Sequence, residues 1–301
     1  MIVPLAVMQK EARKKGYAVP HFLGANFEMT LAAIEAAKEC GSPLALGFAP
    51  EVFAMIPLEY AVPMLREAAD RATVPVSIQL EHGKGYEILA RAISLGMQSV
   101  MFDGSHLPVE ENIQKTKEIV KMAHAFGCDV EAELGYVGGS ALCDIESEES
   151  RETDPDIVLE FIQQSEVDSL AISFGNVHGR YRGEAKLNYA LVEKIAGMTE
   201  VPLTMHGGSG LTKEQYKKSI EAGISNIHFY TNITLGLWRS LEELAKNNEI
   251  FSAHLELVGD VALSEGVVGK IAEGKNVQIA LKETIDEFVM IFESMDDEYM
   301  R

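Results

Sequence analysis

The chain has 301 residues, of which 47% are hydrophobic and 24% are charged. These values are typical of a globular protein, and they exclude disordered, collagen-like and disulfide-dense chains. With 46 acidic and 26 basic residues, the formal net charge is −20. Because so acidic a surface repels polyanions, we expect no nucleic-acid partner.

The three cysteines lie far apart and form no CxxC pair: Cys40, Cys128 and Cys143. Their odd number and wide spacing indicate a reducing compartment, and we expect all three to be structural. The sequence shows no signal-peptide pattern and no run of about 18 apolar residues. We therefore expect a cytoplasmic protein with no membrane partner.

Short apolar runs rich in β-forming residues alternate with helix-like stretches, such as 28–40 and 110–126. There are eight such runs, at 18–24, 43–48, 75–82, 99–104, 129–135, 169–175, 202–207 and 226–231. Glycines end several of the helix-like stretches, and prolines precede three of the apolar runs. Eight such units predict a (β/α)8 TIM barrel, because a doubly wound sheet typically has about five or six strands.

No low-complexity linker divides the chain, so we predict a single barrel domain over 1–301, with a C-terminal helical extension over about 239–301. Within that extension, the amphipathic run 276–300 predicts a helix that packs on the barrel or on a second subunit. The longest irregular segment, 138–155, falls between the fifth strand and its helix. Long loops of this kind usually serve as lids or sites.

Polar residues follow the predicted strands at their carboxyl ends, which form the active-site face of a barrel. These residues are Glu81, His82, Asp103, Glu133, His178 and His206. Three imidazoles that leave one position open form a catalytic zinc site, so we predict zinc at the three histidines. Asp103 and Glu133 are then partners of the ligands or ligands of a second cation, although Glu133 could instead form an ion pair in the barrel mouth.

Small residues follow His206 in the run 207–210, which opens the helix after the seventh strand. Such residues let backbone N–H groups and the Ser209 hydroxyl approach an anion at a helix N-terminus. Phosphate often binds after strands seven and eight of a barrel, where Thr231 is the second expected contributor. A tight glycine turn without a ligand is the alternative interpretation.

Five segments resemble the class II, metal-dependent ketose-bisphosphate aldolases, the family of fructose- and tagatose-bisphosphate aldolases. They read LEHG at 80–83, SVMFDGSHLPVEENI at 99–113, VEAELGYVGG at 130–139, GNVHGRYRGEAKLN at 175–188 and PLTMHGGSG at 202–210. The resemblance implies that His82, His178 and His206 bind zinc, with Asp103 and Glu133 around the metal. It also assigns a phosphate-binding or substrate-binding role to Gly179, Gly207, Ser209 and Asn26.

The sequence departs from the family pattern at several positions near the site. Where the family has an aspartate as the acid/base for the hydroxyl at the cleaved carbon, this chain has Glu81. The phosphate-binding pattern of the eighth strand is represented here by His228, Tyr230 and Thr231. Gly47 and Ala49 replace a glutamine and a serine, 140–142 lacks the acidic pair of the family's mobile loop, and the family's C-terminal Asp-Pro-Arg segment is absent.

These departures indicate a divergent member that keeps its metal ligands and has changed the groups that contact the far end of the substrate. The favoured hypothesis is a zinc-dependent lyase that cleaves a ketose phosphate or bisphosphate, or a related sugar acid or modified sugar. Its products would be dihydroxyacetone phosphate, or a similar ketone, and an aldehyde, with Glu81 accepting the proton of the alcohol.

Two other hypotheses remain open at this point. A metal-dependent sugar-phosphate epimerase or isomerase would use the same site to move protons without breaking the carbon–carbon bond. A non-catalytic aldolase-like partner subunit would explain the missing loop acids. The resemblance also implies a homodimer or homotetramer.

Overall fold

The computed structural model describes residues 2–24, 26–54, 56–139, 150–181 and 183–246, and short stretches between 265 and 287. Two compact units divide the chain, Met1–Thr234 and Leu235–Arg301. Most of the predicted C-terminal extension, including nearly all of 276–300, lies outside the described residues, so its helical character stays a prediction. No helix in the described part of the chain is both long and apolar enough to cross a membrane.

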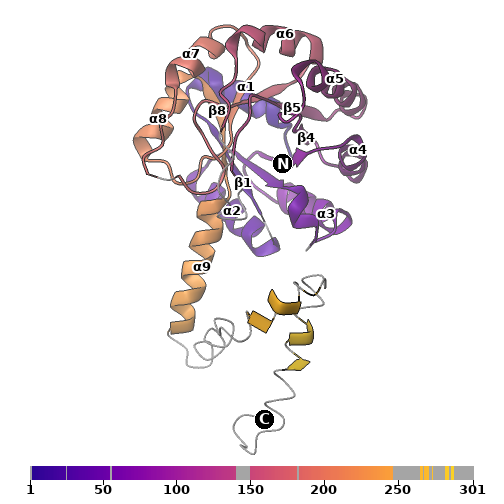
Figure 1. Ribbon diagram of the computed structural model, residues 1–301, viewed down its shortest axis with the longest axis vertical. Helices are drawn as coiled ribbons and strands as arrows, with labels where there is room; N and C mark the ends of the chain where they lie inside the picture. The colour runs from indigo at the N-terminus through magenta and orange to yellow at the C-terminus, as the bar shows by residue number, and fades with distance from the viewer. Residues whose placement is uncertain are drawn as a thin grey trace, which may run out of the picture. The chain divides into compact units, whose positions relative to one another are not determined.

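The first unit contains a closed barrel of eight parallel strands that follow one another in chain order (Figure 1). The strands are β1 Val19–Leu23, β2 Leu44–Phe48, β3 Val76–Gly83, β4 Ser99–Phe102, β5 Asp129–Leu134, β6 Ser169–Ile172, β7 Leu203–Met205 and β8 Ile224–Phe229. The barrel closes where β1 pairs with β8, with His21 opposite His228. The predicted TIM barrel is confirmed.

Helices α2 to α8 follow strands β1 to β7 in turn and lie on the outside of the barrel (Figure 1), whereas α1 precedes β1 and α9 follows β8. The bounds are α1 Leu5–Lys15, α2 Phe27–Cys40, α3 Leu58–Asp70, α4 Tyr86–Leu95, α5 Val109–Ala125, α6 Pro155–Ser165, α7 Tyr189–Ala196, α8 Lys213–Ala222 and α9 Thr231–Lys246, with a short 3-10 helix at Pro50–Ala54. Gly41 and Gly96 end α2 and α4 in the left-handed conformation, with φ of 61° and 104°. These two glycines are helix stops, as the sequence predicts.

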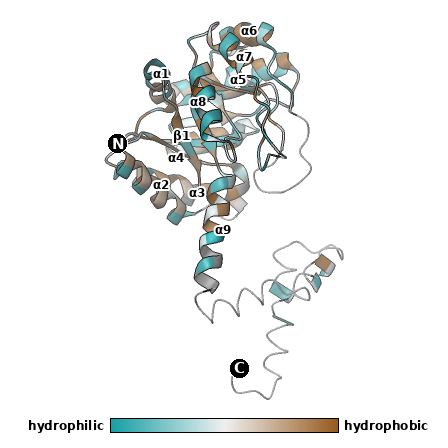
Figure 2. Cartoon of the chain, turned by 90° about the vertical axis from the view of Figure 1, so that its left-hand side faces the viewer, coloured by the Kyte–Doolittle hydropathy of each residue, from teal (hydrophilic) through white to brown (hydrophobic). Residues whose placement is uncertain are grey.

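The main hydrophobic core lies between the strands and the inner faces of the helices. Leu46, Phe48, Ile78 and Leu80 are almost completely buried and belong to one cluster that also contains Leu65 of α3. The outer faces of helices such as α1 and α8 are largely hydrophilic (Figure 2). This two-layer packing leaves the carboxyl ends of the strands free to form a site.

Helix α1 closes the amino-terminal end of the barrel, because it contacts strands on several sides of it. The Ala6 N–H donates to Asp129 Oδ2 of β5 at 2.6 Å. Gln9 Nε2 donates to Thr204 Oγ1 of β7 at 3.1 Å. With this end covered, the opposite end is the one that can admit a ligand.

Candidate metal centre and active site

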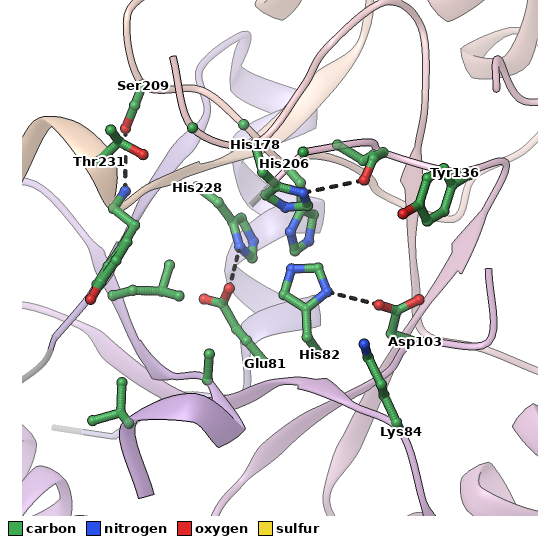
Figure 3. A pocket seen from close by; sticks show the side chains of 18 residues that line it. Glu81, His82, Lys84, Asp103, Tyr136, His178, His206, Ser209, His228 and Thr231 are labelled. Carbon is green, nitrogen blue, oxygen red and sulfur yellow. Dashed lines mark hydrogen bonds and ion pairs between the residues drawn. The ribbon is translucent and has the colours of Figure 1, made fainter. Parts of the chain in front are cut away.

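Three histidines converge at the carboxyl end of the barrel (Figure 3). His82 lies near the end of β3, His178 follows β6 and His206 follows β7. Their ring centroids are 4.7 Å apart for His82 and His206, 4.9 Å for His82 and His178, and 5.7 Å for His178 and His206. One ligand atom from each lies within 4.8 Å of the other two. The three residues predicted to bind zinc are therefore brought together.

Each of these rings has one nitrogen next to a protein oxygen. His82 Nδ1 is 3.1 Å from Asp103 Oδ2, and His206 Nε2 is 3.0 Å from Glu131 Oε1. His178 Nδ1 is 3.3 Å from the Val137 carbonyl oxygen, while its buried Nε2 has no hydrogen-bond partner among the described residues. Metal-binding histidines have this arrangement, in which one nitrogen is oriented by an outer group and the other is left for the metal. The residues present therefore fit a divalent cation.

Backbone strain at the end of β3 orients the first of these rings. His82 has φ of 44°, in the left-handed region that residues with side chains rarely adopt. The register of β3 against β4 also shifts between Leu80 and Gly83. Such a conformation costs about 1–3 kcal/mol and is typical of functional sites, where the surrounding fold holds a side chain in place.

The pKa values of the histidines reflect burial and the neighbouring carboxylate. Burial alone would lower the pKa of His82, but the adjacent Asp103 carboxylate raises it to about 9. Burial, reinforced by His82, lowers the pKa of His206 to about 3 and holds that of His178 well below its usual value. Two of the three imidazoles are thus neutral, which is the form that binds a metal.

Asp103 and Glu133 lie beside the three histidines, as expected. Asp103 Oδ1 accepts hydrogen bonds from the N–H and the hydroxyl of Ser105, at 3.2 and 2.6 Å. Glu133 Oε1 accepts from the Val137 N–H at 3.0 Å, while its buried Oε2 has no partner among the described residues. Burial, with Asp103 nearby, raises the pKa of Glu133 to about 8. Together with His82, these carboxyl groups form a second set able to hold a cation.

Glu81 lines the same pocket and is held by two buried imidazoles. Its Oε1 is 2.7 Å from His21 Nε2, and its Oε2 is 3.1 Å from His228 Nδ1. Burial raises the pKa of the Glu81 carboxyl group, but His228 and His21 outweigh this effect and hold the pKa well below its usual range. The predicted acid/base is therefore an ionised carboxylate at the pocket wall.

The predicted phosphate-binding residues line one part of the pocket. They are Gly179, Gly207, Ser209, His228 and Thr231. Ser209 Oγ accepts from the N–H groups of Tyr230 and Asn232 at 3.3 and 3.2 Å, which joins the loop after β7 to the start of α9. Gly207 has φ of 65°, and a Cβ there would lie only 2.0 Å from the Val177 carbonyl oxygen. Glycine is thus required where the loops after β6 and β7 meet.

Asn26 caps the helix that follows β1, and its predicted substrate-binding role stays a prediction. Its side-chain oxygen accepts from the Met29 N–H at 2.9 Å and caps α2. It is not among the described residues that line the pocket. The role that the structure gives Asn26 is that of a helix cap.

Comparison with known proteins decides the family. The model of the class II fructose-bisphosphate aldolases matches residues 3–295. The chain belongs to this family. It is therefore an aldolase-type lyase, which confirms the resemblance and the enzyme class that its motifs imply. The family is typically metal-dependent, and the described residues include several groups able to hold a metal ion.

Individual relatives agree with this assignment. The aldolase is 38% identical over 277 residues to the fructose-bisphosphate aldolase of Geobacillus stearothermophilus, which covers 90% of this chain and 96% of that one. It is 35% identical over 271 residues to YdjI of Escherichia coli (strain K12), with the same shares of 90% and 96%.

Solved structures show the same fold. The crystal structure of the YdjI aldolase from Escherichia coli K12 has a TM-score of 0.70 at 34% identity, covering 83% of this chain and 87% of that one. A putative fructose-1,6-bisphosphate aldolase from Coccidioides immitis has a TM-score of 0.70 at 27% identity, covering 97% and 96%.

Three residues of the aldolase's site are not indicated by the sequence patterns described above. His21 and Glu131 lie inside strands, so a search of strand ends passes over them, although Glu131 shares the inward face of β5 with Glu133 by simple alternation. Lys84 is exposed and is the only lysine or arginine among the described residues of the pocket wall. In Figure 3 it lies across the histidine cluster from Ser209 and Thr231. Asp144 and Glu146, the acidic residues nearest to 140–142 in the sequence, lie outside the described residues.

Proposed function

We propose that this aldolase binds a zinc ion through His82, His178 and His206 and cleaves a ketose phosphate into a phosphorylated ketone and an aldehyde. The observation that carries the proposal is the convergence of three imidazoles, each oriented by an oxygen on its other nitrogen. An all-nitrogen set of three ligands favours zinc among the common divalent ions. When bound, the cation would polarise the ketose carbonyl and stabilise negative charge as the carbon–carbon bond breaks.

The protein's own groups would hold the substrate at both ends of this centre. The pocket has a volume of about 320 Å³, which suits a sugar phosphate. The phosphate would lie at the loops of Gly179, Gly207 and Ser209, against the N-terminus of α9, where backbone N–H groups favour an anion. This position leaves the far end of the ketose to extend past the histidines towards Lys84.

Glu81 is the group of this chain that would move the proton. As an ionised carboxylate at the pocket wall beside His82, it would accept the proton of the hydroxyl at the cleaved carbon. In the direction of synthesis it would return this proton to the aldehyde oxygen. Dihydroxyacetone phosphate, or a similar ketone, and an aldehyde are the products that we infer from this scheme.

A retro-aldol assay tests the proposal. Purified protein is analysed for zinc and then offered a panel of phosphorylated ketoses, including fructose and tagatose 1,6-bisphosphates and ketose 1-phosphates, while aldehyde release is followed. We expect at least one to be cleaved, with activity lost to a chelator and restored by zinc. A zinc-loaded protein that cleaves none of them would contradict the proposal, and solvent deuterium exchange without aldehyde release would indicate the isomerase instead.

We infer a homodimer or homotetramer from the family alone, and light scattering of the purified chain tests this prediction.

A further inference from the structure

Glu81 of β3 belongs to a buried cluster with His21 of β1 and His228 of β8. His21, Glu81 and His228 have exposed fractions of 0%, 1% and 3%. Each carboxylate oxygen faces a different imidazole, Oε1 facing His21 at 2.7 Å and Oε2 facing His228 at 3.1 Å. The two imidazoles come from directly paired positions of β1 and β8, and their ring centroids are 4.0 Å apart. Each carboxylate oxygen therefore lies within ion-pair distance of one imidazole nitrogen.

Space for this arrangement comes from Gly47 on β2, the strand between β1 and β3. A Cβ at Gly47 would lie 2.6 Å from both Glu81 Oε1 and His21 Nε2. Gly47 is not among the glycines with positive φ, so its backbone conformation does not require glycine. What excludes a side chain at this position is the contact between Glu81 and His21.

His228 is itself anchored on its other side. Its Nε2 is 2.7 Å from Asn226 Oδ1, and Asn226 Nδ2 donates to the Val19 carbonyl oxygen at 2.9 Å. The ring of His228 also packs on that of His206, with centroids 3.9 Å apart. Glu81 is therefore connected through one rigid ring to a residue of the proposed zinc site.

We propose that His21, His228 and Gly47 are positioning residues that fix the Glu81 carboxylate for proton transfer from the substrate hydroxyl. The inference rests on the acid/base role of Glu81 in the proposed function. A glutamate is longer by one methylene than the aspartate of the family pattern, so its carboxylate would not keep one position without these contacts. The absence of a side chain at Gly47 leaves the space that the carboxylate of the longer Glu81 side chain occupies.

Variants at His21 test whether this residue positions the Glu81 carboxylate or only fills space in the barrel interior. His21→Gln keeps a nitrogen donor near the position of Nε2, whereas His21→Leu removes it. We expect His21→Leu to lower kcat by about tenfold to a hundredfold with KM little changed. His21→Gln should keep most of the wild-type kcat. The substrate is the phosphorylated ketose that the wild type cleaves fastest. Equal losses in the two variants, with unchanged thermal unfolding, would overturn the proposal.

A second variant tests the space at Gly47 in case His21→Leu does not fold. Gly47→Ala should lower kcat by about tenfold or more, with zinc content unchanged, because its methyl group displaces the Glu81 carboxylate. Gly85→Ala is the matched control, since Gly85 has φ of −153° and no heavy atom within 4 Å of its Cβ position. Equal kcat values for Gly47→Ala and Gly85→Ala would contradict the proposal.

A readout without turnover distinguishes this inference from the proposed function. If the wild type cleaves no ketose phosphate, the proposed function fails, and the cluster is then tested by 15N NMR of the histidine rings. Glu81→Gln and Gly47→Ala should each shift the signals of His21 and His228, and Gly85→Ala should not. Unshifted signals would overturn the proposal, as would loss of a second equivalent of zinc in His21→Gln, since these residues would then hold a metal.

Discussion

Glu131 Oε1 lies 3.0 Å from His206 Nε2 in the interior of the barrel, and both side chains are almost completely buried. The other oxygen, Oε2, accepts from the Thr204 hydroxyl at 2.7 Å and the Ser169 hydroxyl at 3.2 Å. Thr204 also accepts from Gln9 of α1. A continuous chain of hydrogen bonds therefore runs from the closed end of the barrel to a residue of the proposed zinc site.

We expect Glu131→Gln to weaken zinc binding. The carboxylate orients the His206 ring and increases its basicity, and loss of such a group typically lowers metal affinity by about 10- to 100-fold. Competition with a fluorescent zinc chelator measures the effect directly. Glu118→Gln, at an exposed glutamate of α5, is the matched control. An affinity equal to that of this control would show that Glu131 does not act on the metal site.

The position of Lys84 predicts a negatively charged group at the far end of the substrate. It is the only lysine or arginine among the described residues of the pocket wall, and it lies across the histidines from the phosphate loops (Figure 3). We expect Lys84→Met to raise KM by about tenfold or more for ketose phosphates with a carboxylate or second phosphate at that end. The kcat should change little, because Lys84 would stabilise the bound substrate and the transition state equally.

Two comparisons make this prediction specific. Lys84→Arg, which keeps the positive charge, should retain most of the affinity. Ketose phosphates with a neutral far end should have the same KM in Lys84→Met and in the wild type. A KM increase of equal size for charged and neutral substrates would mean that Lys84 does not read this charge.

The raised pKa of Asp129 predicts that the free energy of unfolding depends on pH. Burial raises its pKa to about 6 from 3.8, although the Ala6 N–H and Ser99 lower it and Asp168 raises it further. As the pH rises from 4 to 7, the unfolded chain releases this proton first, so ionised Asp129 destabilises the folded state. The shift of about two pKa units corresponds to about 3 kcal/mol at most.

Asp129→Asn should remove this contribution, because an asparagine keeps an oxygen for the Ala6 N–H and does not titrate. Urea unfolding of metal-free protein should show the variant gaining up to about 3 kcal/mol on the wild type between pH 4 and pH 7. Asp156→Asn is the control, since the Asp156 side chain is 84% exposed. A constant difference between Asp129→Asn and the wild type across this range would exclude the predicted pKa shift.

Much of the barrel follows from local sequence patterns. All eight strands fall where apolar runs and the glycines and prolines around them predict, with differences only at their ends. β8 begins at Ile224 rather than 226, because α8 ends at Ala222, Gly223 is its C-cap, and pairing with β7 starts at the next residue. β7 is shorter than predicted, Leu203–Met205 against 202–207, because the loop that carries Gly207 leaves the sheet to meet the loop after β6.

The site is predictable only where its residues stand at strand ends. His82, His178 and His206 come together because the carboxyl ends of parallel strands meet at one end of a barrel. His21 and Glu131 could not be assigned in the same way, since their roles depend on which side chains face each other across the barrel interior. The interaction of Glu81 with His21 and His228 likewise depends on strand register, which a linear pattern does not contain.

The central claim is that His82, His178 and His206 bind one zinc ion, and X-ray absorption at the zinc edge tests it most directly. After removal of metal and addition of one equivalent of zinc, we expect three nitrogen neighbours from imidazoles at about 2.0–2.1 Å. An oxygen from water or an added ketose phosphate should complete the shell. A shell containing sulfur, or fewer than three imidazoles, would contradict the account.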